Sequence, residues 1–314
     1  MFRFGYSWVM KLLPSIVGFL LALEACAVPQ SSRVVSPESS DAEISPILRP
    51  PQGRFLKRRV SIERFSNETT YGKSPLLGED VLGRQASDIL SSRLAKTQKF
   101  LLFDAEGTES KKVEADFKIV GSVSQFGRST KGESGVFSKT KTQTAFAAVN
   151  LRVISVRSGI VVFSEEGRGE ADSTTGKVLG VGTADGFDST LSEKAISAAI
   201  SNVISKVVER LLDEAWHSYV LSIDSDGCIV AGGAAQGLRK GDKLVVLKRG
   251  AKIDNPQTGV PIELPGTQVA EIEVVETFGD HALSQASKCT VTSGSLSDMD
   301  TKTLLVKDKG DRRP

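Results

Sequence analysis

The chain of 314 residues has little of what most catalytic centres require. It contains two histidines and three cysteines, and neither histidine stands in a metal-ligand spacing with the cysteines. No nucleophile-elbow motif follows a predicted strand, and the stretch GRGEADSTTGK departs from a phosphate-binding loop at Ala171 and Val178. The sequence therefore predicts no catalytic residue, no metal site and no cofactor, and we expect a protein that is not an enzyme.

A strong charge imbalance and long apolar runs are also missing. The formal net charge is only +2, which argues against a uniformly basic surface, so no nucleic-acid partner is expected. Apolar residues make up 39% and charged residues 25%, as in globular proteins. The length is that of about two domains.

The N-terminus differs from the rest of the chain. Basic residues at Arg3 and Lys11 accompany an apolar run, residues 12–23, that is too short to cross a bilayer comfortably. Residues 1–25 are therefore predicted to be a signal peptide, and the protein is expected to be exported.

The stretch FLLALEACAVPQ can be processed in two ways. Cleavage before Cys26 at a lipoprotein site would leave a lipid on the Cys26 thiol, although Glu24 is unusual at such a site. Cleavage at Ala25-Cys26-Ala27 by an ordinary signal peptidase would release an unanchored chain. Residues 26–53 are rich in Ser and Pro and are expected to be a flexible tether with a reach of roughly 30 Å.

Residues 54–214 alternate strand and helix patterns, which predicts an α/β (α+β) domain, a layered sheet flanked by helices. The first strand has Val60 and Ile62 on one face, and Arg157-Ser158-Gly159 joins the last two strands as a hairpin. Ser189 or Ser192 could cap the closing helix. The predicted strands are 54–65, 99–105, 115–127 and a hairpin within 142–171, and the predicted helices are 76–98 and 188–216.

Residues 215–308 show short strands between Gly-rich turns and no helical period, which predicts a small all-β, barrel-like C-terminal domain before a tail, 309–314. Trp216 and Tyr219 are expected to pack at the domain junction. Cys228 and Cys289 both lie in this domain. In an oxidising compartment they could form a disulfide worth about 3–4 kcal/mol, and otherwise they would be two buried thiols.

The first domain resembles the curli production assembly/transport component (CsgG) family. The segments ADFKIVGSVSQFG and AVNLRVISVRSGIVV are similar to the central block of that family. The earlier VSIERFSNETTYGK and the later helix SEKAISAAISNVISKVV occur in the family's order. The resemblance covers residues 54–212.

The resemblance implies an outer-membrane lipoprotein facing the periplasm. It further implies a homo-oligomeric ring whose subunits contribute hairpins to a shared transmembrane pore for secretion or assembly of extracellular surface polymers. Partners would be the membrane, through the lipid anchor, and a secreted or envelope protein. With this family, the tether and the remaining cysteine pair, lipidation of Cys26 becomes the favoured reading.

The second domain resembles the C-terminal domain of the flagellar assembly protein T. It has that domain's Gly-x-x-x-Gly-Asp turn at 237–242 and its loop residues Asp254, Thr258 and Gly259. Curli transporters end soon after the long helix, so this module is a departure.

Two further features depart from the curli transporters. The loop TTYGKSPLLGED carries none of the family's pore-constriction residues, and Lys131, Glu133, Lys139 and Lys141 are unfavourable on a lipid-facing strand. An alternative is therefore a periplasmic lipoprotein scaffold that binds envelope, flagellar or cell-wall proteins and forms no pore.

Overall fold

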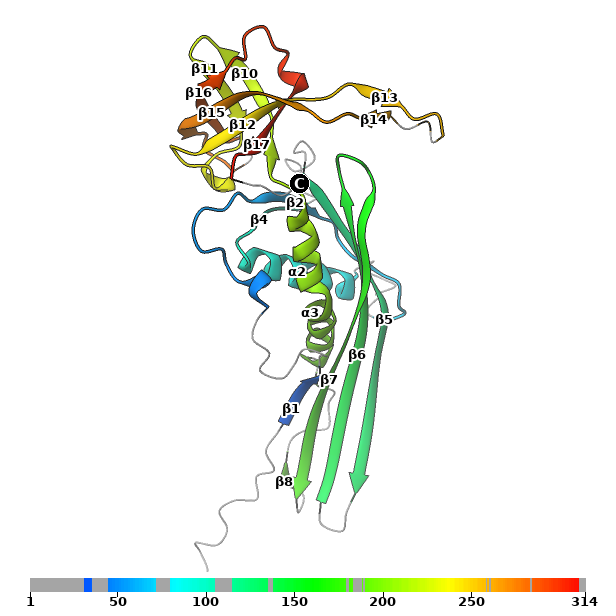
Figure 1. Cartoon of the computed structure of the whole chain (residues 1–314). Coiled ribbons are helices and arrows are strands. Elements are labelled where there is room, and N and C mark those ends of the chain that lie inside the picture. The colour runs from blue at the N-terminus through cyan, green and yellow to red at the C-terminus, as the bar shows by residue number, and fades with distance from the viewer. Residues whose placement is uncertain are drawn as a thin grey trace, which may run out of the picture.

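The computed structural model describes residues 31–35, 45–71, 80–104, 115–134, 138–178, 181–182, 188, 190–257, 259, 261–282 and 284–310. An elongated α/β domain carries a smaller β-rich domain at one end, and long strands run out at the other (Figure 1). Within these described ranges, no helix has both the length and the apolar character needed to cross a bilayer. The predicted signal peptide and Cys26 lie outside them.

The first domain is built on one eight-stranded sheet. Its strand order is β1-β7-β6-β5-β2-β4, with β3 on β5 and β8 on β7. The pairs that β2 and β3 make are parallel, and the other pairs are antiparallel. The strands are β1 (Ser31–Val35), β2 (Arg58–Ile62), β3 (Ser66–Asn67), β4 (Phe100–Asp104), β5 (Phe117–Ser134), β6 (Ser138–Ser155), β7 (Val161–Val178) and β8 (Val181–Gly182).

Two helices pack on this sheet, α2 (Val81–Lys96) and α3 (Thr190–Asp213), and a short 3-10 turn, η1 (Pro46–Leu48), precedes β2. The predicted apolar face of α3 is confirmed, since Ile196, Ile200, Val203, Ile204, Val207, Leu211 and Leu212 are all buried. Of the two predicted caps of α3, Ser192 was wrong because it lies inside the helix, and Ser189 lies outside the described residues. The carboxylate of Asp188 instead accepts hydrogen bonds from the backbone and hydroxyl of Thr190, and these bonds lower the pKa of Asp188.

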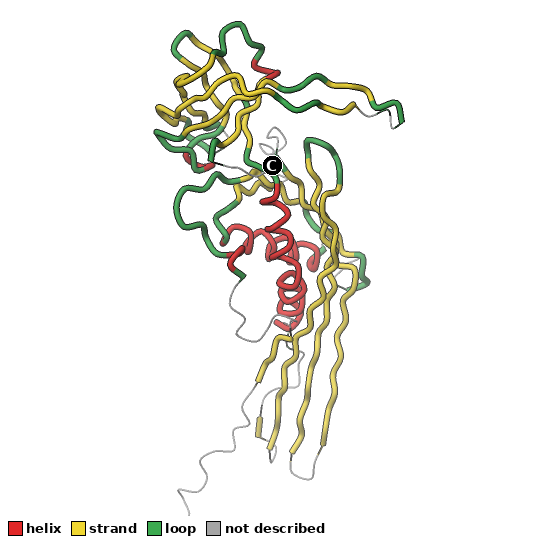
Figure 2. The backbone as a smooth tube through the Cα atoms, in the orientation of Figure 1, coloured by secondary structure: helices red, strands yellow, loops and turns green. Residues whose placement is uncertain are grey.

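Strands β5, β6 and β7 are longer than predicted, at 18 residues each. Their distal parts run past the start of α3 as a bare ribbon of strands (Figures 1 and 2). We call residues 129–134, 138–142 and 174–178 the finger. Its Ser, Thr, Lys and Glu residues lack an apolar alternation, so the hydrophobic pattern alone does not mark them as strand.

Close contact between α3 and β7 depends on two glycines. A Cβ on Gly167 would lie 2.1 Å from the Ala199 carbonyl oxygen, and one on Gly169 would lie 2.2 Å from the Ala199 nitrogen. The GRG stretch that superficially suggests a phosphate-binding loop therefore lets the helix backbone approach the strand.

The second domain is a seven-stranded sheet with a separate two-stranded arm. The sheet order β10-β11-β16-β15-β12-β17-β9 nearly closes on itself, which confirms the predicted barrel-like module. Trp216 is buried in the core of this domain, and Leu56 from the first domain joins that core. The strands are β9 (His217–Ser218), β10 (Val220–Asp224), β11 (Gly227–Ala231), β12 (Lys243–Lys248), β15 (Thr267–Phe278), β16 (Ala286–Gly294) and β17 (Leu304–Asp308), and the arm is β13 (Lys252–Asp254) and β14 (Pro261–Glu263).

The structure differs from the predicted tether, residues 26–53, in two places. Strand β1 pairs antiparallel with β7, from Ser31 opposite Thr174 to Val35 opposite Glu170. Ile47 and Leu48 pack against the first core, and the Lys99 ammonium donates to the Ile47 carbonyl. Backbone pairing and core packing thus hold parts of a segment whose Ser- and Pro-rich composition suggested a free chain.

Substitution of Gly169 by alanine tests the helix–strand contact. We expect Gly169→Ala to lower the free energy of unfolding by about 1–3 kcal/mol, because the methyl group would force α3 away from β7. Gly132→Ala is the control, since nothing lies within 4 Å of a Cβ there. Equal urea midpoints for the two variants would contradict the close-packing account.

Candidate functional site

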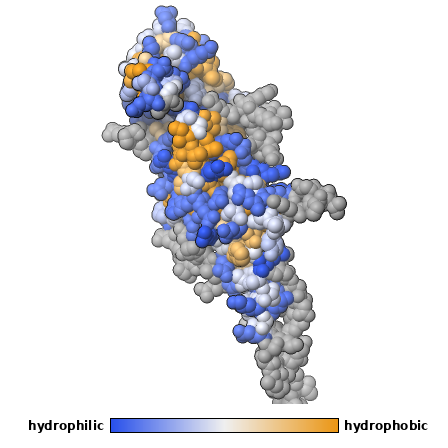
Figure 3. Space-filling view, turned by 90° about the vertical axis from the view of Figure 1, so that its right-hand side faces the viewer, coloured by the Kyte–Doolittle hydropathy of each residue, from blue (hydrophilic) through white to orange (hydrophobic). Residues whose placement is uncertain are grey.

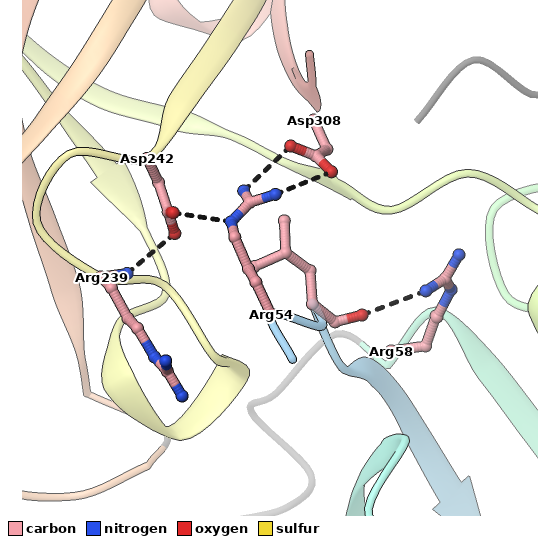
Figure 4. Close-up of polar contacts among 6 residues, drawn as sticks. Arg54, Arg58, Arg239, Asp242 and Asp308 are labelled. Carbon is pink, nitrogen blue, oxygen red and sulfur yellow. Dashed lines mark hydrogen bonds and ion pairs between the residues drawn. The ribbon is translucent and has the colours of Figure 1, made fainter. Parts of the chain in front are cut away.

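The contact between the two domains centres on Arg54. Its guanidinium binds Asp308 through two hydrogen bonds of 2.9 and 3.2 Å, and its Nε lies 2.6 Å from Asp242 (Figure 4). Burial by itself lowers the pKa of Arg54, but the hydrogen bonds and charges of Asp308 and Asp242 outweigh it and raise this pKa above its ordinary value. Arg54 therefore stays charged and holds β17 and the turn before β12 to the chain that leads into β2.

The predicted Gly-x-x-x-Gly-Asp turn supplies the second-domain side of this contact. Gly237 has φ +94°, and a Cβ there would lie 2.2 Å from the Phe55 carbonyl oxygen. Gly241 has φ +89°, and the carboxylate of Asp242 accepts from the Arg239 backbone N–H at 2.9 Å while it binds Arg54 (Figure 4). The turn therefore needs glycine for backbone approach and aspartate for charge.

The chain next to Arg54 reaches both cores. Leu56 packs in the second core, whereas Phe55 packs on the first. The Lys57 N–H donates to the Gln236 carbonyl at 2.8 Å, and the Arg58 guanidinium donates to the carbonyls of Leu56 and Glu214. Residues 54–58, which we call the junction segment, thus link the two domains by apolar, backbone and ionic contacts at once.

A buried polar cluster lies beside the junction segment. Asp116 accepts from the backbone and the side chain of Arg59 at 2.8 and 2.9 Å, and the Nε2 atom of His217 lies 3.6 Å from the same carboxylate. Burial lowers the pKa of His217 to about 4. The charge of Asp116 opposes this shift, while Arg157 and Arg59 add to it. His217 is therefore neutral near pH 7.

The two described cysteines lie opposite each other on neighbouring strands. Cys228 on β11 is the register partner of Cys289 on β16, and both are buried free thiols. A hydrogen bond between the thiols lowers the pKa of Cys228 and raises that of Cys289. The structure thus brings the predicted pair together, and the disulfide itself stays a prediction.

The finger is polar on both faces. Lys131, Thr142 and Thr174 are register neighbours on one face, and Lys141 and Thr175 lie on the other. The two threonine hydroxyls of the first face are 3.4 Å apart. No apolar side chain occurs at residues 129–133, 140–142 or 174–175, the finger positions whose side chains are described. Residues 72–79, most of the loop compared with the curli constriction, lie outside the described residues.

The sequence patterns did not indicate the junction segment or the ion pair between Asp308 and Arg54. Arg54 stands at the start of a predicted strand, and its partners are 188 and 254 residues away along the chain. The only local signal was the Gly-x-x-x-Gly-Asp turn, which shows where a loop forms but not what it binds. Within the described residues, no group of three or more His, Cys, Asp or Glu side chains is arranged to hold a metal.

The fold and contacts define a two-domain protein built on an elongated mixed sheet with a β-rich module fixed to one end. The family model of the curli production assembly/transport component CsgG matches residues 47–116 and 107–238, more than half of the chain. The chain belongs to this family. A protein of Neisseria meningitidis serogroup B named "Putative lipoprotein NMB1126/NMB1164" is 30% identical over 177 residues, which cover 51% of this chain and 79% of the relative.

Distant likenesses to solved structures also exist. The PelC dodecamer from Paraburkholderia phytofirmans is 18% identical, with a TM-score of 0.25 over 58% of this chain and 97% of that one. Lipoprotein GNA1162 from Neisseria meningitidis is 12% identical, with a TM-score of 0.22 over 50% and 99%. These likenesses are too distant to bear on assembly. The likeness of the second domain to the flagellar assembly protein T stays a prediction.

Removal of the Arg54 charge tests the junction. We expect Arg54→Met to lower the free energy of unfolding by about 2 kcal/mol, because Asp242 and Asp308 would be left without their cation. Urea unfolding followed by fluorescence of the buried Trp216 measures this loss. Arg168→Met is the matched control, since its ion pair with Glu166 is exposed and worth at most about 1 kcal/mol. Equal losses would show that the junction pair is no stronger than a surface pair.

The pH dependence of stability tests His217. The folded pKa of about 4 lies below the unfolded value of 6.5, so the unfolded chain binds more protons between these values. Stability should therefore fall as pH falls through this window, by about 3 kcal/mol in total. His217→Gln should flatten this slope, whereas His281→Gln, at an exposed residue, should leave it unchanged. A slope that survives in His217→Gln would assign it to other groups.

Proposed function

We propose that the protein is an outer-membrane lipoprotein on the periplasmic side that assembles into a ring and serves the secretion or assembly of extracellular surface polymers. Membership of the curli assembly/transport family is the observation that carries this proposal. The relative described as a lipoprotein supports the anchor. In this proposal no catalytic step is required, and the protein works by anchoring, association and passage or placement of a partner polymer.

The position of β1 supports a definite orientation. Ser31 pairs with Thr174 near the distal end of β7, and Cys26 precedes Ser31 by only five residues. Five residues span at most about 18 Å, and the end of β7 at Val178 lies about 13 Å beyond Thr174. A lipid on Cys26 therefore keeps the finger close to the membrane and leaves the β-rich domain far from it.

An open strand edge supports association. Beyond Val123, strand β5 pairs with β6 and, within the described residues, with no strand on its other side. The backbone of such a strand edge can serve as a template for a strand of another chain. The finger strands of β5, β6 and β7 are antiparallel, and β8 pairs antiparallel with the end of β7, an arrangement compatible with a family that contributes paired hairpins to a ring.

The polar finger favours a second candidate, the scaffold that forms no pore. A strand that faces lipid should present apolar side chains on alternate positions, and charged residues there cost about 2–4 kcal/mol at mid-depth. The described finger residues show Lys and Thr on both faces instead, and Glu133 on one of them. Under this candidate, the finger would contact envelope proteins from the periplasmic side of the membrane.

Labelling with palmitate tests the anchor. We expect wild-type protein made in a Gram-negative host to incorporate label and to sediment with outer membranes, whereas Cys26→Ala should lose the label and become soluble, because no other residue is proposed to carry lipid. Cys228→Ala, which alters a buried cysteine, is the control and should keep both properties. A Cys26→Ala chain that still carries label would refute the anchor.

Particle mass and conductance then separate the two candidates. The detergent-extracted wild-type protein should behave as a particle of many chains and give stepwise conductance in planar bilayers. A multimer that does not conduct would support the scaffold, and a monomer would refute the ring.

A further inference from the structure

The β13–β14 arm stands away from the body of the second domain. It contains two three-residue strands and projects sideways past the turn between β6 and β7 (Figures 1 and 2). Ile253 and Ile262 are cross-strand partners and are 53% and 54% exposed, and Leu264 at the base of the arm is also exposed. An isolated two-stranded hairpin is only marginally stable in water. An arm whose apolar pair is about half exposed would therefore gain stability by packing against another surface.

A second exposed apolar group lies on the same side of the molecule. The β6–β7 turn exposes Val156, Ile160 and Val161, and Ile160 is 62% exposed. We call these three residues the turn patch. In the view of that side, apolar surface gathers just below the second domain (Figure 3). Exposed apolar groups of this kind, contributed by two domains, are typical of interaction surfaces.

The arm and the turn patch carry opposite charges. Asp254 and Glu263 lie on the arm strands with Lys252, and Arg249 at the arm base binds Glu263 at 2.8 and 2.9 Å. Exposed Arg152 and Arg157 flank the turn patch, and residues 152–161 contain no carboxylate. The net charge is therefore negative on the arm strands and positive around the turn.

The arm and the turn patch also lie at one level along the molecule. Hydrogen bonding to Arg249 lowers the pKa of Glu263, with smaller contributions from the charges of Lys252 and Arg157. Arg157 is thus close enough to act on the arm of its own chain, yet the apolar residues of both groups remain exposed. If each chain is anchored to the membrane by a lipid on its own Cys26, neighbouring chains have the same orientation. The arm of one chain would then lie beside the turn patch of the next.

We propose that the arm docks on the turn patch of a second copy of this chain. Ile253 and Ile262 would cover Val156, Ile160 and Val161, and Asp254 would approach Arg157 of that copy. The orientation rests on the proposed function, but the contact lies at the opposite end of the long strands from the finger. The arm lies outside the part matched by the family model, which ends at residue 238, whereas the turn patch lies within it, so the second domain would add one half of this interface.

Site-specific photo-cross-linking of the full-length membrane-bound protein tests this contact. A photoreactive residue replaces Ile262 in one isotopically labelled chain, co-expressed with an unlabelled chain. We expect a two-chain adduct whose cross-linked peptide contains residues 156–161 of the other isotope. The same probe at Leu221, which is 55% exposed on β10 of the same domain, is the control and should give none. Only intrachain adducts, an adduct with a different protein, or equal yields from both sites would overturn the proposal.

Charge exchange supplies a second test that does not depend on the apolar residues. Arg157→Glu should reduce the two-chain adduct by at least half, and addition of Asp254→Arg in the same chain should restore it. Both residues are exposed, so neither change should unfold the protein. Failure of the restoring change would count against the contact.

Membrane sedimentation and particle mass of the wild type report on the proposed function separately. If the wild type sediments with membranes as a multimer but gives no two-chain adduct, only the arm contact is refuted.

Discussion

The ion pair between Arg54 and the carboxylates of Asp242 and Asp308 fixes the relation between the two domains. It joins the chain that leads into β2 to strand β17 and to the turn before β12, and Leu56, two residues after Arg54, packs in the second core. The same stretch forms a backbone hydrogen bond to the glycine turn through Lys57. Because a guanidinium with two carboxylates is directional, this contact fixes orientation where apolar packing alone would allow sliding. The level of the arm relative to the β6–β7 turn depends on it.

A second constraint shapes the opposite end. Gly167 and Gly169 let α3 lie directly on β7, and the apolar face of α3 buries the proximal half of the long strands. Where α3 begins, at Thr190, this cover ends and the finger continues as paired backbone with polar side chains. Hydrogen bonding between strands, with no core beneath it, extends the sheet there. The protein thus separates a packed region, which holds its shape, from a bare strand region with an edge open to other chains.

The proposed orientation relates these two ends to the envelope. Pairing of β1 with β7 leaves only a short chain between Cys26 and β1, so a lipid on Cys26 would bring the finger to the membrane. The second domain would then extend into the periplasm, with its arm directed sideways. Association through strand edges near the membrane and through the arm farther away would use different chemistry, backbone hydrogen bonding in one case and apolar contact with charge complementarity in the other.

Local patterns in the sequence were sufficient to predict the helices, the β6–β7 hairpin and the burial of Val60 and Ile62, because helical and strand periodicities are set by neighbouring residues. They also predicted the β-rich module and the family likeness. The finger escaped prediction because strand pairing can continue through Ser, Thr and Lys without an apolar signal, and the junction because its partners are distant in sequence. Only the tertiary structure showed that Arg54 joins two domains and that the GRG glycines serve helix packing, and it brought together Cys228 and Cys289, a pair that the cysteine count had already suggested. These contacts depend on which distant segments meet in space, and the local sequence around each residue does not determine its distant partners.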